Sequence, residues 1–156
     1  SIAKSLGMII HYHNRSKLSK DKENGATYHK DLKSLMSVAD VLSVCCPATK
    51  ETTNMINKKT LEYLPTGAVV TNVARGDIVD DEALIEALNS RKVYAVGLDV
   101  YQGEPNLNPG YLKHKSAFIL PHLGSASKQT RTAMGNLAID NIDEFFKTGS
   151  CKNKVN

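Results

Sequence analysis

Short apolar runs alternate along the chain with longer stretches in which apolar residues recur every three or four positions. The short runs predict β-strands and the periodic stretches predict amphipathic helices. We expect strands at 8–13, 41–47, 68–74, 94–100 and 117–122, and helices at 29–40, 57–64, 80–93 and 127–148. Such alternation, with short connections, is typical of a parallel sheet covered by helices on both faces. Right-handed crossovers then predict a doubly wound α/β domain.

Two of the predicted helices have clear ends. In 80–93, the expected N-cap is Asp80 or Asp81. The last helix is expected to run from Ser127 to Thr148, with Gly149 ending it. One face of each helix is apolar: Ala83, Leu84, Ala87 and Leu88 in the first, and Ala133, Met134, Leu137, Ala138, Ile142, Phe145 and Phe146 in the second. The stretch 101–116 is expected to be a long loop, and long loops in compact domains often carry function.

The composition argues against several classes of protein. Of the 156 residues, 41% are hydrophobic and 23% charged, as in an ordinary globular domain. No apolar run approaches roughly 18 residues, and the start resembles no secretory signal, so we expect no membrane span. The net charge of +4 comes with scattered lysines and no aromatic-rich basic patch, which argues against nucleic acid as a partner. Cys45, Cys46 and Cys151 form no CxxC pair, which predicts no metal site and favours a reducing compartment, the cytoplasm.

The beginning of the chain, "SIAKSLG", resembles the second half of a helix that leads into the strand at Met8. A doubly wound fold places a strand and a tight glycine-rich turn before such a helix, and the sequence contains no GxGxxG. We therefore expect a truncated domain whose first strand and phosphate loop are missing from this chain. The alternative is a short helix that opens a smaller α/β domain.

Three charged side chains follow the ends of predicted strands. The carboxyl ends of parallel strands share one edge, where doubly wound folds bind ligands, so Arg75, Glu104 and His122 are expected there together. Arginine is costly to bury and its planar guanidinium suits a carboxylate. Glu104 beside His122 would favour the charged, proton-donating imidazolium. The alternatives are an arginine that reaches solvent, an exposed loop acid and a structural histidine.

Two further places carry polar residues of interest. Asp99 lies within an apolar run and is expected to meet a specific donor, although a backbone cap would also satisfy it. Asn14, Arg15 and Ser16 follow the first predicted strand, where an acidic residue would bind the ribose hydroxyl of NAD. Because an arginine stands there instead, the turn favours the 2′-phosphate of NADP. The alternative is a solvated polar turn.

Three stretches together resemble the signatures of the D-isomer-specific 2-hydroxyacid dehydrogenase family: "ARGDIVDDEALIEAL", "GLDVYQGEP" and "LPHLGSAS", in that order. A fourth, "HYHNRSKL", resembles the glyoxylate/hydroxypyruvate reductase branch, whose members prefer NADPH. The resemblance covers nearly the whole chain. It implies a Rossmann-type cofactor domain over 1–149, and a segment at 150–156 that begins the return to a substrate domain.

The resemblance also implies roles for individual residues. Arg75 would bind the carboxylate and carbonyl of a small 2-oxo acid, and His122 would be the acid–base, with Glu104 its partner. Asp99 would hold the nicotinamide carboxamide, and four further residues would line the cofactor groove, namely Pro47, Thr52, Val73 and Gly124. NADPH is the preferred cofactor and NAD a possible one. The whole protein is expected to form a homodimer.

Two alternatives stay open within this resemblance. Corepressor-like proteins of the same fold sense a dinucleotide without turnover and can keep all three charged residues. Phosphoglycerate dehydrogenase and formate dehydrogenase relatives are the other alternative. Glu104 argues against the formate enzymes, which usually have glutamine there, and the absence of an acid near Arg15 argues against most phosphoglycerate enzymes.

Residues 1–156 by themselves are expected to be inactive, because the phosphate loop and most of the substrate domain are not among them. Assaying this polypeptide for reduction of glyoxylate or hydroxypyruvate tests the expectation. A measurable rate would contradict it.

Overall fold

A computed structural model describes residues 2–155. The chain divides between Pro121 and His122 into two compact units. All strands and all helices but one belong to the first unit. Its elements are α1 (Ile2–Ser5), β1 (His11–His13), α2 (Lys20–Glu23), β2 (Thr27–His29), α3 (Leu32–Met36), β3 (Val41–Val44), α4 (Lys58–Leu61), β4 (Ala68–Asn72), the 3₁₀ turn η1 (Gly76–Ile78), α5 (Asp81–Asn89), β5 (Val93–Leu98), η2 (Pro109–Lys113) and β6 (Ala117–Ile119). The second unit contains α6 (Lys128–Thr148).

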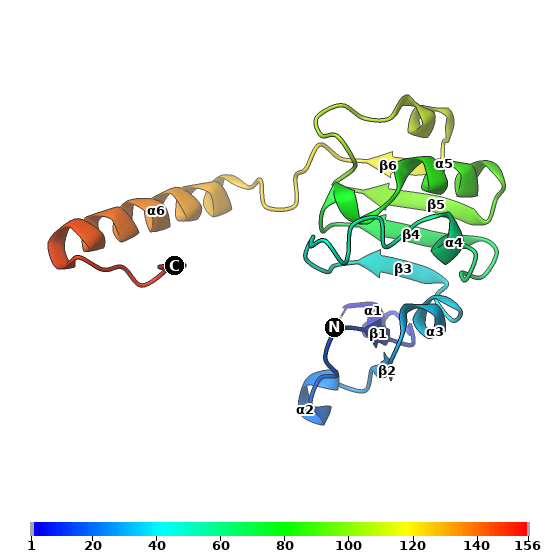
Figure 1. The fold of residues 1–156 in the computed structure, drawn as a ribbon, viewed down its shortest axis with the longest axis horizontal. Coiled ribbons are helices and arrows are strands. Elements are labelled where there is room, and N and C mark those ends of the chain that lie inside the picture. The colour runs from blue at the N-terminus through cyan, green and yellow to red at the C-terminus, as the bar shows by residue number, and fades with distance from the viewer. Residues whose placement is uncertain (1, 156) are drawn as a thin grey trace. The chain divides into compact units, whose positions relative to one another are not determined.

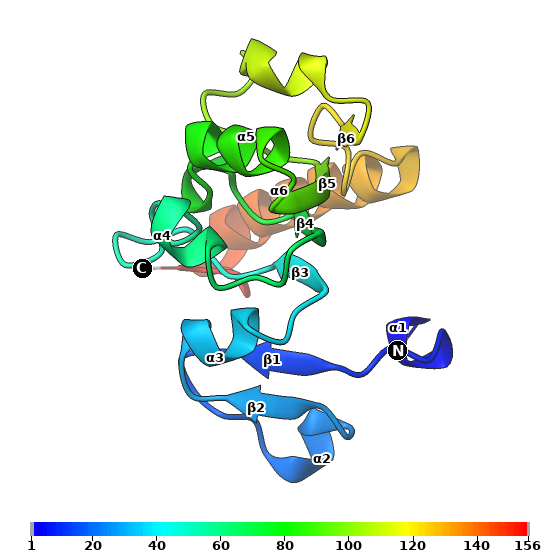
Figure 2. The same cartoon turned by 90° about the vertical axis from the view of Figure 1, so that its right-hand side faces the viewer.

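The strands form two parallel ladders rather than the single sheet expected from the sequence. One ladder pairs β1 with β2, and the other has the order β3-β4-β5-β6 (Figure 1). A doubly wound sheet has the strand order 3-2-1-4-5-6, in which the first strand lies at the centre. The pairs β2-β1 and β3-β4 match the two sides of that centre, and no strand of residues 2–155 lies between them (Figure 2). The two ladders are separate because this position contains no strand to join them.

Several predicted elements exist but are shorter, and one strand was missed. The strand expected at 8–13 is reduced to β1, and the helix expected at 29–40 is reduced to α3. That helix begins where the Asp31 carboxylate accepts a hydrogen bond from the Ser34 amide at 2.8 Å. The missed strand, β2, has only three residues, too few for a period-two pattern. The expected loop at 101–116 contains the turn η2.

The hydrophobic core lies between the β3–β6 ladder and helices α4 and α5. Val70 on β4 and Leu84 on α5 are completely buried, and burial of such side chains contributes about 1.5–3 kcal/mol each. Asp80 is the N-cap of α5, since its carboxylate accepts from the Ala83 amide at 3.1 Å. The opposite face of the sheet stays partly open within the first unit, with Val41 44% and Phe118 66% exposed.

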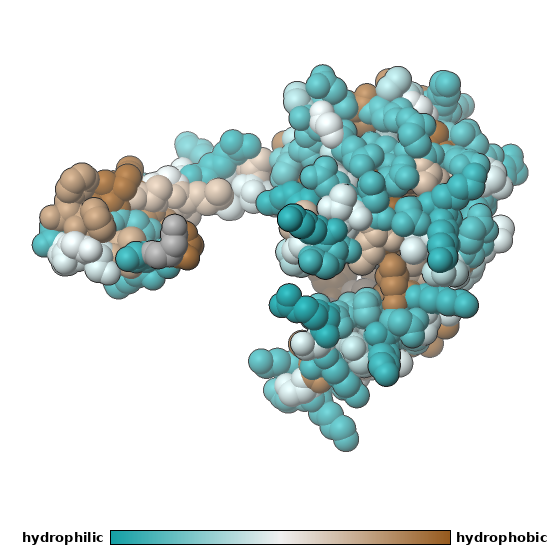
Figure 3. Space-filling model, viewed as in Figure 1, coloured by the Kyte–Doolittle hydropathy of each residue, from teal (hydrophilic) through white to brown (hydrophobic). Residues whose placement is uncertain are grey.

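Helix α6 has the ends that the sequence predicts. The Ser127 side chain accepts from the Thr130 amide at 3.1 Å, and Gly149 ends the helix in the left-handed region with φ 75°. None of the residues of α6 is buried among residues 2–155. Met134, Leu137, Ile142, Phe145 and Phe146 are 52–83% exposed. Figure 3 shows hydrophobic surface on this part of the chain. Within residues 2–155, no helix is both long enough and apolar enough to cross a membrane.

A buried carboxyl begins helix α5. Asp81 is 4% exposed, and its Oδ1 accepts a hydrogen bond from the Tyr111 hydroxyl at 2.9 Å, while Oδ2 has no hydrogen-bond partner. Burial raises the pKa of Asp81, and the hydrogen bond from Tyr111 opposes this effect only in part. The folded protein therefore holds a proton on this carboxyl more tightly than the unfolded chain does.

Replacing Asp81 with asparagine should change how stability depends on pH. Because the folded pKa is raised, the stability contributed by Asp81 is complete below its unfolded pKa and is lost as pH rises through the folded value. Asp81→Asn keeps an acceptor for Tyr111 and removes the ionisation. The free energy of unfolding of this variant should therefore rise relative to that of wild type as pH increases above about 4. Urea unfolding across that range measures the difference. Asp77→Asn, at an exposed position, is the matched control and should run parallel to wild type.

Gly76 lies against the backbone of another segment. A Cβ at this position would overlap the carbonyl oxygen of Tyr101, which belongs to the backbone and cannot turn aside. Only glycine therefore lets the β4–α5 connection lie against the segment that follows β5.

Gly76→Ala should destabilise the protein by roughly 1–3 kcal/mol through this overlap. Gly97→Ala is the matched control, since its Cβ would make an ordinary 3.4 Å contact with Thr71 Cγ2. Both changes restrict the unfolded chain equally, so their difference in urea midpoint reports the overlap. Equal midpoints would contradict the steric argument.

Candidate active site

A pocket of about 520 Å³ lies at the carboxyl ends of β3 and β4. Doubly wound folds bind ligands at this edge of the sheet. The pocket is lined by the residues that follow the two strands: Cys45, Cys46, Pro47, Ala48, Val73, Ala74 and Arg75. Three predicted site residues, Pro47, Val73 and Arg75, are therefore brought together.

Arg75 is exposed, and its backbone is extended, with φ −149° and ψ 147°. Its guanidinium Nη1 donates to the carbonyl oxygen of Ala74 at 2.6 Å. The Asn72 side chain donates to the Arg75 carbonyl oxygen at 2.9 Å and accepts from the Ala74 amide at 3.0 Å. The arginine thus leaves the sheet on a short loop that is held by hydrogen bonds.

Thr52 supports the other wall of this pocket. Its hydroxyl donates to the Pro47 carbonyl oxygen at 2.9 Å and accepts from the Thr49 amide at 2.7 Å. These bonds close the loop after β3 around Pro47. Thr52 therefore shapes the predicted cofactor groove from behind, and it is not one of the residues that line the pocket.

The polar turn at Asn14, Arg15 and Ser16 is exposed directly after β1. The pKa of Glu51 is lowered, chiefly by a hydrogen bond with the Thr49 side chain and to a smaller extent by the charge of Arg15. The part that this turn plays in cofactor binding stays a prediction.

Asp99 and Glu104 follow strand β5. Asp99 is 8% exposed, and its amide donates to the carbonyl oxygen of Asn72 at 3.0 Å, which ties it to the end of β4. Glu104 is exposed, and its Oε1 accepts from the Tyr101 amide at 3.2 Å. Tyr101 is the residue that Gly76 contacts, so Glu104 and Arg75 are carried by neighbouring segments.

His122 and Gly124 belong to the second unit, which is described by itself. The backbone of His122 is in the left-handed region, with φ 56°, which is uncommon for a residue other than glycine. The joint placement of Arg75, Glu104 and His122 therefore stays a prediction.

Sequence reasoning missed four residues that line the pocket: Cys45, Cys46, Ala48 and Ala74. Only their place after the ends of β3 and β4 could have indicated them, because nothing else in the sequence marks these four residues as lining a pocket. Among residues 2–155, no group of three or more His, Cys, Asp or Glu is arranged to hold a metal ion.

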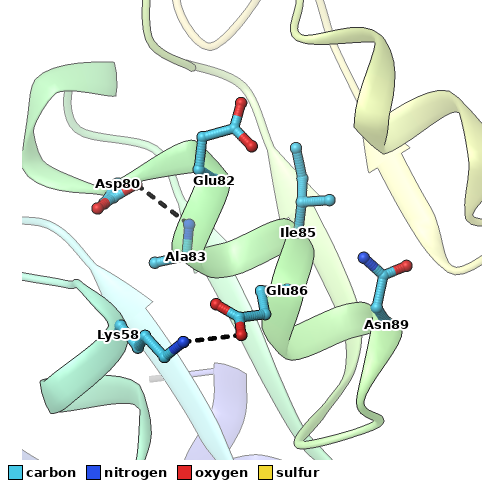
Figure 4. Close-up of a pocket in the computed structure, with 7 residues that line it drawn as sticks. All are labelled: Lys58, Asp80, Glu82, Ala83, Ile85, Glu86 and Asn89. Atoms are coloured by element: carbon cyan, nitrogen blue, oxygen red, sulfur yellow. Dashed lines mark hydrogen bonds and ion pairs between the residues drawn. The ribbon is translucent and has the colours of Figure 1, made fainter.

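A second pocket, of about 330 Å³, lies between α4 and α5, away from the strand ends. Its charged side chains are engaged with neighbours (Figure 4): Lys58 Nζ lies 2.8 Å from Glu86 Oε1, and Asp80 caps α5. The Glu82 Oε1 accepts a hydrogen bond from the side-chain Nδ2 of Asn108 at 2.7 Å. These contacts join surface helices, and the strand-end pocket is the better candidate site.

Comparison with known proteins agrees with this geometry. A sequence model of the D-isomer specific 2-hydroxyacid dehydrogenase NAD binding domain matches residues 1–124. Glycerate dehydrogenase of Hyphomicrobium methylovorum is 42% identical over 146 residues, which cover 92% of this chain and 45% of that protein. Glyoxylate reductase of Thermococcus litoralis is 36% identical, with coverage of 99% and 46%.

Solved structures give the same result. The NADPH-dependent glyoxylate/hydroxypyruvate reductase of Sinorhizobium meliloti, in complex with NADP and malonate, is 36% identical with a TM-score of 0.91. The match covers 97% of this chain and 46% of that one, so the chain spans about half the length of the relatives it matches. The parallel ladders, the strand-end pocket and the family match together show that this chain belongs to the D-isomer specific 2-hydroxyacid dehydrogenase family, as its Rossmann-type NAD-binding domain.

Proposed function

We propose that the whole protein reduces a small 2-oxo acid of the glyoxylate or hydroxypyruvate type to the D-2-hydroxy acid with NADPH. One observation carries the proposal: Arg75 is exposed in a pocket at the carboxyl ends of two parallel strands. A guanidinium in that place offers paired donors to a carboxylate. The glyoxylate reductases among the relatives support this substrate class.

The residues present fit a nicotinamide dinucleotide. The pocket lined by Pro47 and Val73 lies where doubly wound folds bind such a group. Asp99 directly follows the neighbouring strand, β5. We also assign Thr52, which holds the loop around Pro47, and Gly124 to cofactor binding. When bound, the cofactor supplies the hydride.

A preference for NADPH is proposed from the turn after β1. Asn14, Arg15 and Ser16 are exposed there, with no acid in the turn to bind a ribose 2′-hydroxyl. Arg15 offers a charged, bidentate donor to a 2′-phosphate. The NADP complex of the Sinorhizobium meliloti reductase supports the preference, and NAD is the less favoured cofactor.

The remaining chemistry is assigned to side chains of this chain. Arg75 binds the carboxylate of the 2-oxo acid and steadies negative charge on the carbonyl oxygen as the bond to carbon weakens. His122, in its protonated form, donates a proton to that oxygen. Glu104 is assigned as the partner of His122 in this step.

Two further proposals concern the compartment and the assembly of the whole protein. All three cysteines are free thiols, which favours a reducing compartment, and we assign the protein to the cytoplasm. The whole protein is proposed to act as a homodimer, as the family resemblance implies.

Initial rates on the full-length protein test both the reaction and the cofactor. Glyoxylate and hydroxypyruvate should each be reduced faster with NADPH than with NADH. Arg15→Ala should raise the KM for NADPH roughly 10- to 100-fold, the effect of losing one charged hydrogen-bond donor, and leave the KM for NADH unchanged.

Lys20→Ala is the matched control, because it removes the same charge from the exposed surface of α2 and should change neither KM. An unchanged KM for NADPH in Arg15→Ala, or faster turnover with NADH than with NADPH, would keep the reaction and discard the cofactor preference. Tight dinucleotide binding without turnover of either acid would replace the enzyme with a dinucleotide-sensing binding protein.

A further inference from the structure

The Asn72 side chain is buried at the end of β4, directly before the loop that carries Arg75. It is 1% exposed, one of three polar or charged residues among the buried ones described. A buried amide is costly unless its groups are paired. Both of its polar atoms are paired here, and both partners lie in the Arg75 loop rather than in the core.

The two hydrogen bonds of Asn72 enclose the arginine. Oδ1 accepts from the Ala74 amide at 3.0 Å, and Nδ2 donates to the Arg75 carbonyl oxygen at 2.9 Å. The guanidinium in turn donates to the Ala74 carbonyl oxygen. The peptide group before Ala74 and the one after Arg75 are therefore both held by Asn72, which ends a strand paired on both sides.

The chemistry of the amide explains why this residue type is needed. One side chain must accept a hydrogen bond from residue 74 and donate one to residue 75. An ionised carboxylate only accepts, and an apolar side chain does neither. Gly76, packed against the Tyr101 carbonyl, limits the loop from its other end.

We propose that Asn72 is a positioning residue for Arg75: its amide holds the extended backbone from which the guanidinium meets the carboxylate of the substrate. The inference rests on the proposed role of Arg75 in binding a 2-oxo acid. Ordering the loop in advance reduces the entropy lost when an exposed arginine binds its anion.

The test compares kinetic constants in the full-length protein. Asn72→Ala should raise the KM for the 2-oxo acid and lower kcat, together about 100-fold in kcat/KM, because small misplacements of a positioning group have effects of this size. The preference for NADPH over NADH should change by less than about 3-fold, since the Arg15 turn is not held by this amide.

Asn57→Ala is the matched structural control. Its amide also accepts one backbone hydrogen bond, from Thr60, and donates one, to the Asn54 carbonyl oxygen, but it caps α4 away from the pocket. This variant should lose comparable stability in urea unfolding and keep its kcat/KM. If both variants lose activity in proportion to stability, Asn72 has only a structural role and the proposal is overturned.

Asn72→Asp supplies a second readout, the pH profile. When protonated, the introduced carboxyl can accept and donate as the amide does, and when ionised it can only accept. The kcat/KM of this variant, divided by that of wild type at each pH, should therefore rise as pH falls. A ratio that does not change with pH would count against the proposal.

Malonate binding separates failure of this inference from failure of the proposed function. If the wild-type protein shows no turnover, the reductase proposal fails, and calorimetric titration with malonate still reports on the anion site at Arg75. Asn72→Ala should weaken malonate at least about 10-fold, while Asn57→Ala should not. Equal affinities, or no binding by wild type, would overturn the positioning role.

Discussion

The parallel pairing of β4 with β3 and β5 is the constraint on which the rest of this structure depends. Because all three strands run the same way, the segments that leave them emerge at one edge of the sheet. Pro47, Arg75 and Asp99 come from three distant parts of the sequence, and the ladder alone brings them to that edge. The core on the α4–α5 face makes the edge rigid, because Val70 and Leu84 leave the strands no room to shift.

Polar groups at this edge are buried only where they organise the loops. Asn72 holds the segment that carries Arg75, and the backbone amide of Asp99 donates to the Asn72 carbonyl oxygen. Arg75 and Glu104 remain exposed, where they keep their hydration until a ligand replaces it. Buried amides thus hold the loops in place, and the Arg75 side chain is exposed at the pocket. Strand-end sites in parallel sheets suit this division, because the strands are rigid and the loops are short.

Much of the local structure could be predicted because its causes are local. The amphipathic period and the N-cap at Asp80 define α5, and Ser127 and Gly149 define both ends of α6. Arg75 could be predicted as a site residue because arginine is costly to bury, so an arginine directly after an apolar run is expected to have a partner. The strand β2 could not be predicted, since its three residues are ordered only by pairing with β1. The sequence also did not mark Cys45 and Cys46 as pocket residues, because whether a residue lines a pocket depends on which other segments lie opposite it.

From the residues alone we could infer the class of the domain, the ends of its main helices and the residues able to bind an anion or donate a proton. These follow from periodicity, capping and side-chain chemistry, which act over a few residues. Three features became clear only from the folded chain. The strands form two ladders, the Thr52 hydroxyl holds the loop around Pro47, and the Asn72 side chain holds the loop of Arg75. Each of these depends on which segments meet in space, and pairing between distant segments leaves no pattern in the residues of either one.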